Sequence, residues 1–147
     1  VRYQSPSLTV IEDFAHHPTA VQVTLQSLRT RFPGHRLVAC LEPRSGTTRT
    51  SAHQSTFPGA LAIADVAVLA PVYKGENLAV DKRLNTQQLA ADIRSQGRLA
   101  VAAESCQGIP QLVQQHTGAS PTVVVFCTNG SFEGAFDQYL SALPPSV

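Results

Sequence analysis

Short apolar runs alternate along the chain with segments whose apolar residues recur at helical spacing. Turn-forming residues bound these runs, and we expect buried strands at residues 8–11, 36–42, 66–72, 99–103 and 122–127. The expected helices carry apolar faces at Val21, Leu25, Leu28 and Phe32; at Leu89 and Ile93; at Ile109, Leu112 and Val113; and at Phe132, Phe136, Tyr139, Leu140 and Leu143. One further helix is expected in the second half of residues 53–64, and Pro18 suits the first position of the first helix.

This alternation predicts a three-layer, Rossmann-like α/β fold. Right-handed crossovers between parallel strands place helices on both faces, so we expect a mostly parallel sheet of about five or six strands. With 147 residues, of which 43% are hydrophobic, the chain suits a single domain, residues 1–147. Ligands of such sheets bind at the carboxyl ends of the strands.

Composition narrows the classes of partner. The net charge is +1 and only 14% of residues are charged, so we expect neither a nucleic-acid nor a membrane partner. Cys40, Cys106 and Cys127 lack metal-type spacing, and we expect buried free thiols in a reducing compartment, the cytoplasm. The adjacent pair His16–His17 is poorly spaced for a metal on a helix, and we expect no metal site.

Three loops at the carboxyl edge of the predicted sheet carry side chains suited to ligand binding. They are residues 13–18, 43–49 and 128–134. A fourth loop, residues 74–85, is long and charged, and we expect it to be a solvated surface excursion.

The three loops carry a family resemblance in the sequences DFAHHPT (residues 13–19), LEPRSGTT (41–48) and CTNGSFEG (127–134). Together they resemble the C-terminal domain of the Mur ligases over residues 8–143. The second and third motifs point to the branch that joins UDP-N-acetylmuramate to L-alanyl-γ-D-glutamyl-meso-diaminopimelate in peptidoglycan recycling. The first motif is shared with the branch that adds L-alanine. Gly46, Ser131 and Glu133 depart from the residues usual in the recycling branch.

The resemblance implies ATP-dependent amide bond formation through an acyl phosphate. It implies ATP and Mg²⁺ as cofactors, UDP-N-acetylmuramate and the tripeptide as substrates, and an N-terminal and a central domain in the same chain. None of the nine glycines is followed by Lys, so no phosphate-binding loop occurs in these residues. We expect that loop and the magnesium ligands in the central domain. The chain contains no Met, and we expect a fragment that is inactive alone, with no catalytic residue assigned.

For ATP, the resemblance implies Asp13 as the acceptor of the ribose hydroxyls, with Phe14 and His16 beside it. A carboxylate accepts hydrogen bonds from two hydroxyls readily. The alternative for Asp13 is a cap of the turn before the helix. For either histidine, a purely structural role is an equal alternative.

For the acceptor peptide, the resemblance implies Arg44 as the grip on a carboxylate, with Ser45, His17, Asn129, Gly130 and Ser131 nearby. A planar guanidinium donates two parallel hydrogen bonds to a carboxylate. The alternative for Arg44 is a surface arginine that pairs with Glu42 or with a neighbour in another domain. For the last loop the alternative is an ordinary strand-to-helix turn. Three functions stay open: the domain of the recycling ligase, the same domain of the L-alanine-adding ligase, and a free-standing nucleotide-binding α/β module.

Overall fold

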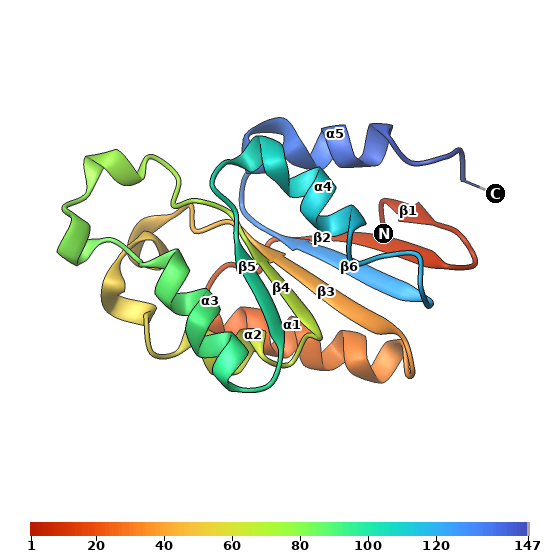
Figure 1. Ribbon diagram of the computed structural model, residues 1–147, viewed down its shortest axis with the longest axis horizontal. Helices are drawn as coiled ribbons and strands as arrows, with labels where there is room; N and C mark the ends of the chain where they lie inside the picture. Colours follow the sequence, from red (N-terminus) through yellow and green to blue (C-terminus); the bar gives the residue numbers. More distant parts are fainter. Residues whose placement is uncertain (147) are drawn as a thin grey trace.

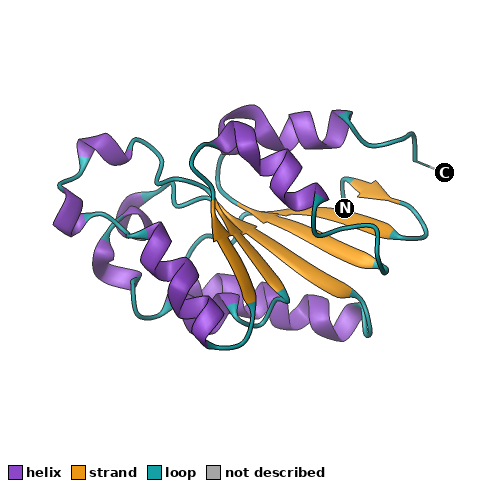
Figure 2. Ribbon diagram, in the orientation of Figure 1, coloured by secondary structure: helices purple, strands orange, loops and turns teal. Residues whose placement is uncertain are grey.

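A computed structural model describes residues 1–146 (Figures 1 and 2). Strands and helices alternate, as expected from the apolar pattern. The elements are β1 (Tyr3–Gln4), β2 (Leu8–Asp13), α1 (Pro18–Arg31), β3 (Arg36–Leu41), α2 (Phe57–Leu61), β4 (Val66–Leu69), α3 (Thr86–Ser95), β5 (Leu99–Ala102), α4 (Ile109–Gln114), β6 (Thr122–Cys127) and α5 (Ala135–Ser141).

The strands form one sheet of six in the order β1-β2-β6-β3-β4-β5. All neighbours pair in parallel except β1, which pairs antiparallel with β2 at the edge. The predicted α/β fold class is therefore confirmed. The sequence pattern did not predict β1, because a strand of two residues has no periodicity of its own and depends on its partner.

Helices cover both faces of the sheet. In Figure 1, α1, α2 and α3 lie on one face, while α4 and α5 lie on the other. Successive side chains of β3 point alternately into two hydrophobic cores. Leu37, Ala39 and Leu41 pack towards α1–α3, and Val38 and Cys40 pack towards α4 and α5. All carboxyl ends of the parallel strands thus meet at one edge.

Several element ends differ from the sequence prediction. Pro18 does open α1, but Phe32 caps that helix from outside and Leu143 lies beyond the end of α5. Phe132 is buried as expected, yet it belongs to a short turn with φ of 54° before α5. The fourth strand ends at Leu69, before Pro71, whose ring removes a ladder donor.

The segment at residues 74–85 is more than a surface excursion, so that expectation was wrong in part. Val80 is exposed, but Leu84 is only 2% exposed and belongs to the core under α1–α3. Arg83 also forms an isolated bridge with Thr50, and the backbone of Leu84 donates to the carbonyl of Arg49 at 2.9 Å. These contacts fasten the segment to the loop that follows β3.

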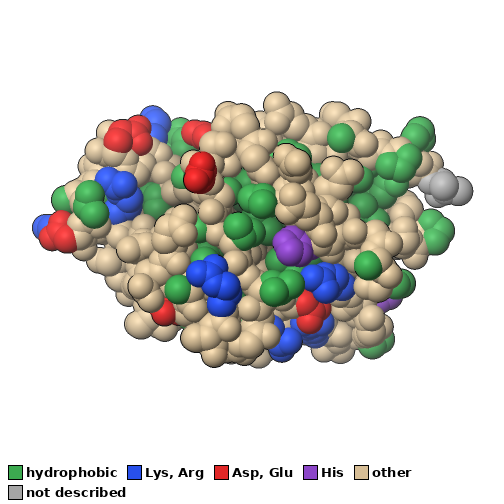
Figure 3. Space-filling view, viewed as in Figure 1, with side chains coloured by type: hydrophobic (Ala, Val, Ile, Leu, Met, Phe, Trp, Pro, Cys, Tyr) green, Lys and Arg blue, Asp and Glu red, His purple; other side chains and the backbone are tan. Residues whose placement is uncertain are grey.

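The surface carries few charges. In Figure 3, acidic and basic side chains are scattered over the visible face and form no patch of a single sign. Within residues 1–146, no helix combines the length and the apolar composition needed to cross a bilayer.

Candidate functional site

Three of the loops singled out in the sequence lie next to one another at the carboxyl edge. The strands before them, β2, β6 and β3, are direct neighbours, and Cys127 is in register with both Asp13 and Leu41. Backbone hydrogen bonds extend the pairing past the strand ends: Thr128 N–H donates to Asp13 O at 3.1 Å, and Glu42 N–H donates to Cys127 O at 3.2 Å. The sheet thus joins the first, second and third motifs into one site.

Asp13 is the last residue of β2, and one oxygen of its carboxylate is hydrogen-bonded within the protein. Its Oδ1 accepts hydrogen bonds from Ala15 N–H at 2.7 Å and from the hydroxyl of Thr24 at 3.4 Å, so the turn-capping role is real. Oδ2 accepts no hydrogen bond from any described residue and remains able to accept from a ligand. A carboxylate has room for both roles.

Beside Asp13 lies a shallow hollow of about 610 Å³. Phe14 is 81% exposed and Val23 is 58% exposed at this hollow, which is unusual for large apolar side chains. An apolar ring next to a carboxylate acceptor fits a nucleoside, whose base stacks and whose ribose donates hydrogen bonds. The described residues here therefore fit the nucleotide that the sequence motif implies.

The two histidines of the first motif lie differently. The ring Nδ1 of His16 is 2.7 Å from the carbonyl of Phe14 and so ties the turn to itself. His17 caps α1 by accepting from Thr19 N–H at 3.4 Å, and its ring meets that of His53 edge-on, with centroids 4.5 Å apart. His53 comes from the loop after β3, and no local pattern in the sequence singled it out.

Arg44 is held between two neighbours. Its guanidinium carbon lies 3.8 Å from the centre of the Tyr73 ring, a stacked cation–π contact. On another side it lies against Gly130, where a β-carbon would collide with the Arg44 side chain. No ion pair joins Arg44 to Glu42, or to any other acidic residue among residues 1–146. Its donor groups are therefore free for a ligand.

Tyr73 was missed in the sequence, although its position offered a signal. It follows β4, which is the neighbour of β3, so its loop had to meet the loop of Arg44. Its backbone N–H donates to Pro43 O at 2.9 Å, which fixes the ring beside the arginine. The prediction would have required the strand order, which is not a local property.

Glu42 fastens the second motif to the third from inside the protein. It is fully buried, and its Oε1 accepts from the hydroxyl of Thr128 at 2.7 Å and from Phe132 N–H at 3.0 Å. The turn so held contains Phe132 and Glu133 with φ near 54° and 53°, a left-handed conformation that costs free energy for residues other than glycine. The buried carboxylate is placed to maintain that strained turn.

The remaining residues of the predicted peptide site have modest roles in this structure. Ser131 caps the turn before α5 by accepting from Gly134 N–H at 3.3 Å, and Gly130 N–H donates to the hydroxyl of Thr128 at 2.8 Å. Asn129 is exposed, and its side chain makes no hydrogen bond within the described chain. Ser45 precedes a short turn and offers a half-buried hydroxyl.

The cysteines near the site are protonated. Burial and then the charge of Asp13 raise the pKa of the Cys127 thiol to about 12. Burial, followed by Glu133 and Glu42, raises the pKa of the Cys106 thiol to about 12. Neither thiol is a ready nucleophile. Over residues 1–146, no group of three His, Cys, Asp or Glu side chains is arranged to hold a metal ion.

Comparison with known proteins agrees with this geometry. A family model described as "Mur ligase, glutamate ligase domain" matches residues 1–130, which include the whole of the first and second motifs. The chain belongs to the Mur ligase family. A UDP-N-acetylmuramate–L-alanine ligase of Streptococcus suis is 34% identical to this Mur ligase chain, and the match covers 94% of this chain. The chain spans only 30% of the length of that relative.

Solved structures of Mur ligases share the fold. A murein peptide ligase from Psychrobacter arcticus has a TM-score of 0.74 and 26% identity, with 96% of this chain and 28% of that chain covered. A domain from Haemophilus ducreyi, described as a UDP-N-acetylmuramate:L-alanyl-γ-D-glutamyl-meso-diaminopimelate ligase, has a TM-score of 0.68 and 24% identity. The matched region covers 94% of this chain and 93% of that domain. The chain is therefore a C-terminal Mur ligase domain.

Proposed function

We propose that this domain belongs to a cytoplasmic, ATP-dependent ligase that joins UDP-N-acetylmuramate to L-alanyl-γ-D-glutamyl-meso-diaminopimelate in peptidoglycan recycling. In this proposal the domain binds ATP and the acceptor peptide. An N-terminal and a central domain of the same protein bind the sugar nucleotide, the phosphates and Mg²⁺.

The main support for the proposal is the way in which neighbouring residues hold the Arg44 side chain. The guanidinium is stacked on Tyr73, confined by Gly130 and free of any acidic partner among the described residues, at the carboxyl edge of the sheet. A fork held in one orientation suits bidentate binding of a carboxylate. An acceptor peptide has carboxylates remote from its attacking amine, and gripping one of them positions the amine without touching the reaction.

Asp13, Phe14 and His16 form the nucleotide side of the proposal. Asp13 Oδ2 would accept from the ribose hydroxyls, while Phe14 offers its exposed ring to the base. His16 holds the turn through its contact with the Phe14 carbonyl. When bound, ATP supplies the phosphoryl group that activates the carboxylate of UDP-N-acetylmuramate. These three residues bind and orient the nucleotide.

One observation favours a second candidate, the ligase that adds L-alanine. The Streptococcus suis relative carries that name, and its identity of 34% is above the 26% of the Psychrobacter arcticus ligase. That candidate keeps the same nucleotide site and needs no grip on a remote carboxylate.

Competition between acceptors separates the two candidates. The complete ligase that contains this domain is supplied with ATP, UDP-N-acetylmuramate and equal concentrations of L-alanine and the tripeptide, and both products are quantified by mass spectrometry. We expect the tripeptide product to dominate. A dominant L-alanine product would refute the recycling assignment in favour of the second candidate.

A further inference from the structure

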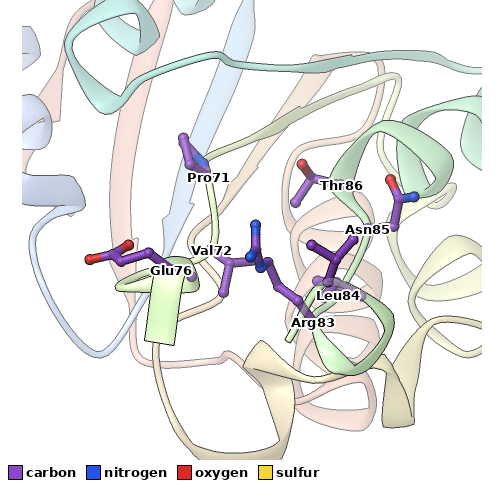
Figure 4. A pocket seen from close by; sticks show the side chains of 9 residues that line it. Pro71, Val72, Glu76, Arg83, Leu84, Asn85 and Thr86 are labelled. Atoms are coloured by element: carbon purple, nitrogen blue, oxygen red, sulfur yellow. The ribbon is translucent and has the colours of Figure 1, made fainter. Parts of the chain in front are cut away.

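A pocket of about 500 Å³ opens beyond Arg44 along the sheet edge, where β4 gives way to the segment leading into α3. Figure 4 shows the side chains that line it. Apolar walls come from Pro71, Val72 and Leu84, and Thr86 lines the side formed by the start of α3. A pocket of this size and lining suits part of a small, extended ligand.

Arg83 is the cation of this pocket. Its Nη2 donates to Leu78 O at 3.1 Å, and its methylene chain lies against Gly75, where a β-carbon would come within 3.2 Å of Arg83 Cδ. In Figure 4 the guanidinium reaches into the pocket beside Val72, and Glu76 also lines the pocket without pairing with it. Within the described chain Arg83 has no ion pair, and its Nε has no hydrogen-bond partner. A fixed guanidinium without an anion is suited to bind one.

A second arginine approaches the same segment from the loop after β3. Arg49 Nη2 donates to Lys74 O at 3.2 Å, and its Nε likewise has no partner among the described residues. The carbonyl of Arg49 accepts from the backbone of Leu84, so Arg49 and Arg83 are joined by neighbouring backbone. Arg83 in the lining and Arg49 beside it thus outnumber the single acidic residue of the lining, Glu76, which favours an anionic group.

The strand order places this pocket relative to the rest of the site. Asp13 follows β2, Arg44 follows β3 and the pocket follows β4, with β6 between β2 and β3. Val72 contacts the pocket, and the adjacent Tyr73 carries Arg44. A ligand that reaches Arg83 from the nucleotide side must therefore extend past Arg44.

We infer that this pocket binds the third residue of the acceptor peptide, with Arg83 gripping a carboxylate of its diaminopimelate. The inference rests on the proposed function, because L-alanine has no group that extends past Arg44. The aliphatic chain of diaminopimelate matches the apolar walls, and its terminal carboxylate matches the guanidinium. Phosphates of ATP are disfavoured as the occupant because the nucleotide hollow lies two strands beyond Arg44.

The test compares acceptors with and without the third residue. Steady-state kinetics of the complete ligase are measured with the tripeptide and with the dipeptide L-alanyl-γ-D-glutamate, for the wild type and for Arg83→Gln. The variant should raise the KM for the tripeptide by roughly 10- to 100-fold, as expected for a lost charge-assisted hydrogen bond. The KM values for the dipeptide and for ATP should stay unchanged.

Two further variants complete the design. Arg94→Gln is the matched control, because Arg94 also donates to a backbone carbonyl, that of Ala100 at 2.9 Å, but lies outside the pocket. It should leave all three KM values unchanged. Arg83→Lys keeps the positive charge but loses the planar guanidinium, so it should give a KM for the tripeptide between those of the wild type and Arg83→Gln. This variant provides the test if Arg83→Gln lowers the melting temperature.

Three results would overturn the inference: an unchanged tripeptide KM in Arg83→Gln, an equal rise for dipeptide and tripeptide, or a rise confined to ATP. Failure of the proposed function is detected in a different experiment, the competition between acceptors, in which the wild type would then prefer L-alanine. A wild type that prefers the tripeptide, together with an indifferent Arg83 variant, would refute this inference alone.

Discussion

Arg44 illustrates how much the placement of a proposed binding residue depends on its neighbours. The stack on Tyr73 and the contact with Gly130 limit the rotamers of a long side chain that would otherwise lose conformational entropy on binding. Preorganisation of this kind raises affinity without a new contact. The sequence motif identified Arg44, but the two residues that hold it come from the loops after β4 and β6.

The first prediction at this scale is that Arg44→Lys and Gly130→Ala impair the same step. Lysine keeps the charge and loses the fork, whereas alanine at 130 displaces the Arg44 side chain. In the complete ligase, each should raise the KM for the tripeptide by about 10-fold or more with the KM for ATP unchanged. Steady-state kinetics measure both constants.

Two controls match these variants. Arg31→Lys alters an arginine that also lies over an aromatic ring, that of Phe32, but far from the sheet edge. Gly59→Ala adds a methyl group where no atom lies within 4 Å. If Gly130→Ala left the tripeptide KM as low as Gly59→Ala does, the contact between Gly130 and Arg44 would have no role in binding.

The second prediction concerns Glu42. It distinguishes the effect of the hydrogen-bond acceptor at this position from the effect of its charge. Glu42→Ala leaves the Thr128 hydroxyl and Phe132 N–H buried without an acceptor, which should lower the free energy of unfolding by about 2–5 kcal/mol. Glu42→Gln retains a carbonyl oxygen and removes a buried charge, so it should recover most of that loss. Urea denaturation of both variants measures the difference. Equal destabilisation would show that the charge itself matters.

At the scale of elements, Asp65 fastens the amino ends of the strands. Its Oδ2 accepts from Leu37 N–H in β3 at 2.8 Å, and its Oδ1 pairs with Arg29 of α1 at 3.0 Å and with Arg98 before β5 at 3.7 Å. Burial alone opposes ionisation, but the hydrogen bonds from Arg29 and Leu37 and the two positive charges hold the pKa of Asp65 below its usual value. Asp65 therefore stabilises the fold more when its carboxyl group is ionised than when it is protonated.

The third prediction follows from the sign of that shift. Because the pKa of Asp65 is lower in the folded than in the unfolded state, its contribution is full well above pH 3.8 and is lost as the pH falls through 3.8 towards the folded value. Asp65→Asn should destabilise the domain by about 1–2 kcal/mol at neutral pH and flatten the loss of stability between about pH 5 and about pH 2. Urea denaturation across this range measures both effects.

Asp81→Asn serves as the control for the acid series, since Asp81 is exposed and has no ion pair within residues 1–146. Its acid dependence should match that of the wild type. An Asp65 variant with the same acid dependence as the wild type would mean that the ionisation of Asp65 is not coupled to folding.

The elements also mark the limit of prediction from the sequence. The run of β6 and the periodic face of α1 are local patterns, and both elements were expected close to where they lie. The two residues of β1 and the docking of Leu84 depend on partners far along the chain, so no local pattern indicates them. For the same reason, the motifs indicated three loops that prove to be neighbours at the sheet edge, but not that Tyr73 stacks on Arg44.

On the scale of the whole molecule, the strand order arranges the proposed subsites in a row. The nucleotide hollow lies at β2, the carboxylate grip at β3 and the pocket of Arg83 at β4, all along one edge. Such a row suits an extended acceptor whose amine lies near the nucleotide end and whose last residue lies far from it.

The last prediction concerns the activity of the chain by itself. None of its nine glycines precedes a lysine, and no acidic cluster suited to a metal occurs in the part of the chain that the structure describes. ATP hydrolysis requires cationic groups and a metal to neutralise the developing phosphoryl charge. The purified 147 residues should therefore release no phosphate from ATP above the level of a heat-denatured sample. We expect this result although the chain should fold cooperatively. A coupled phosphate-release assay measures this, with the complete ligase as the positive control. Turnover by the isolated chain that disappears in Asp13→Ala would place phosphoryl chemistry within this domain and contradict its proposed role as a binding domain.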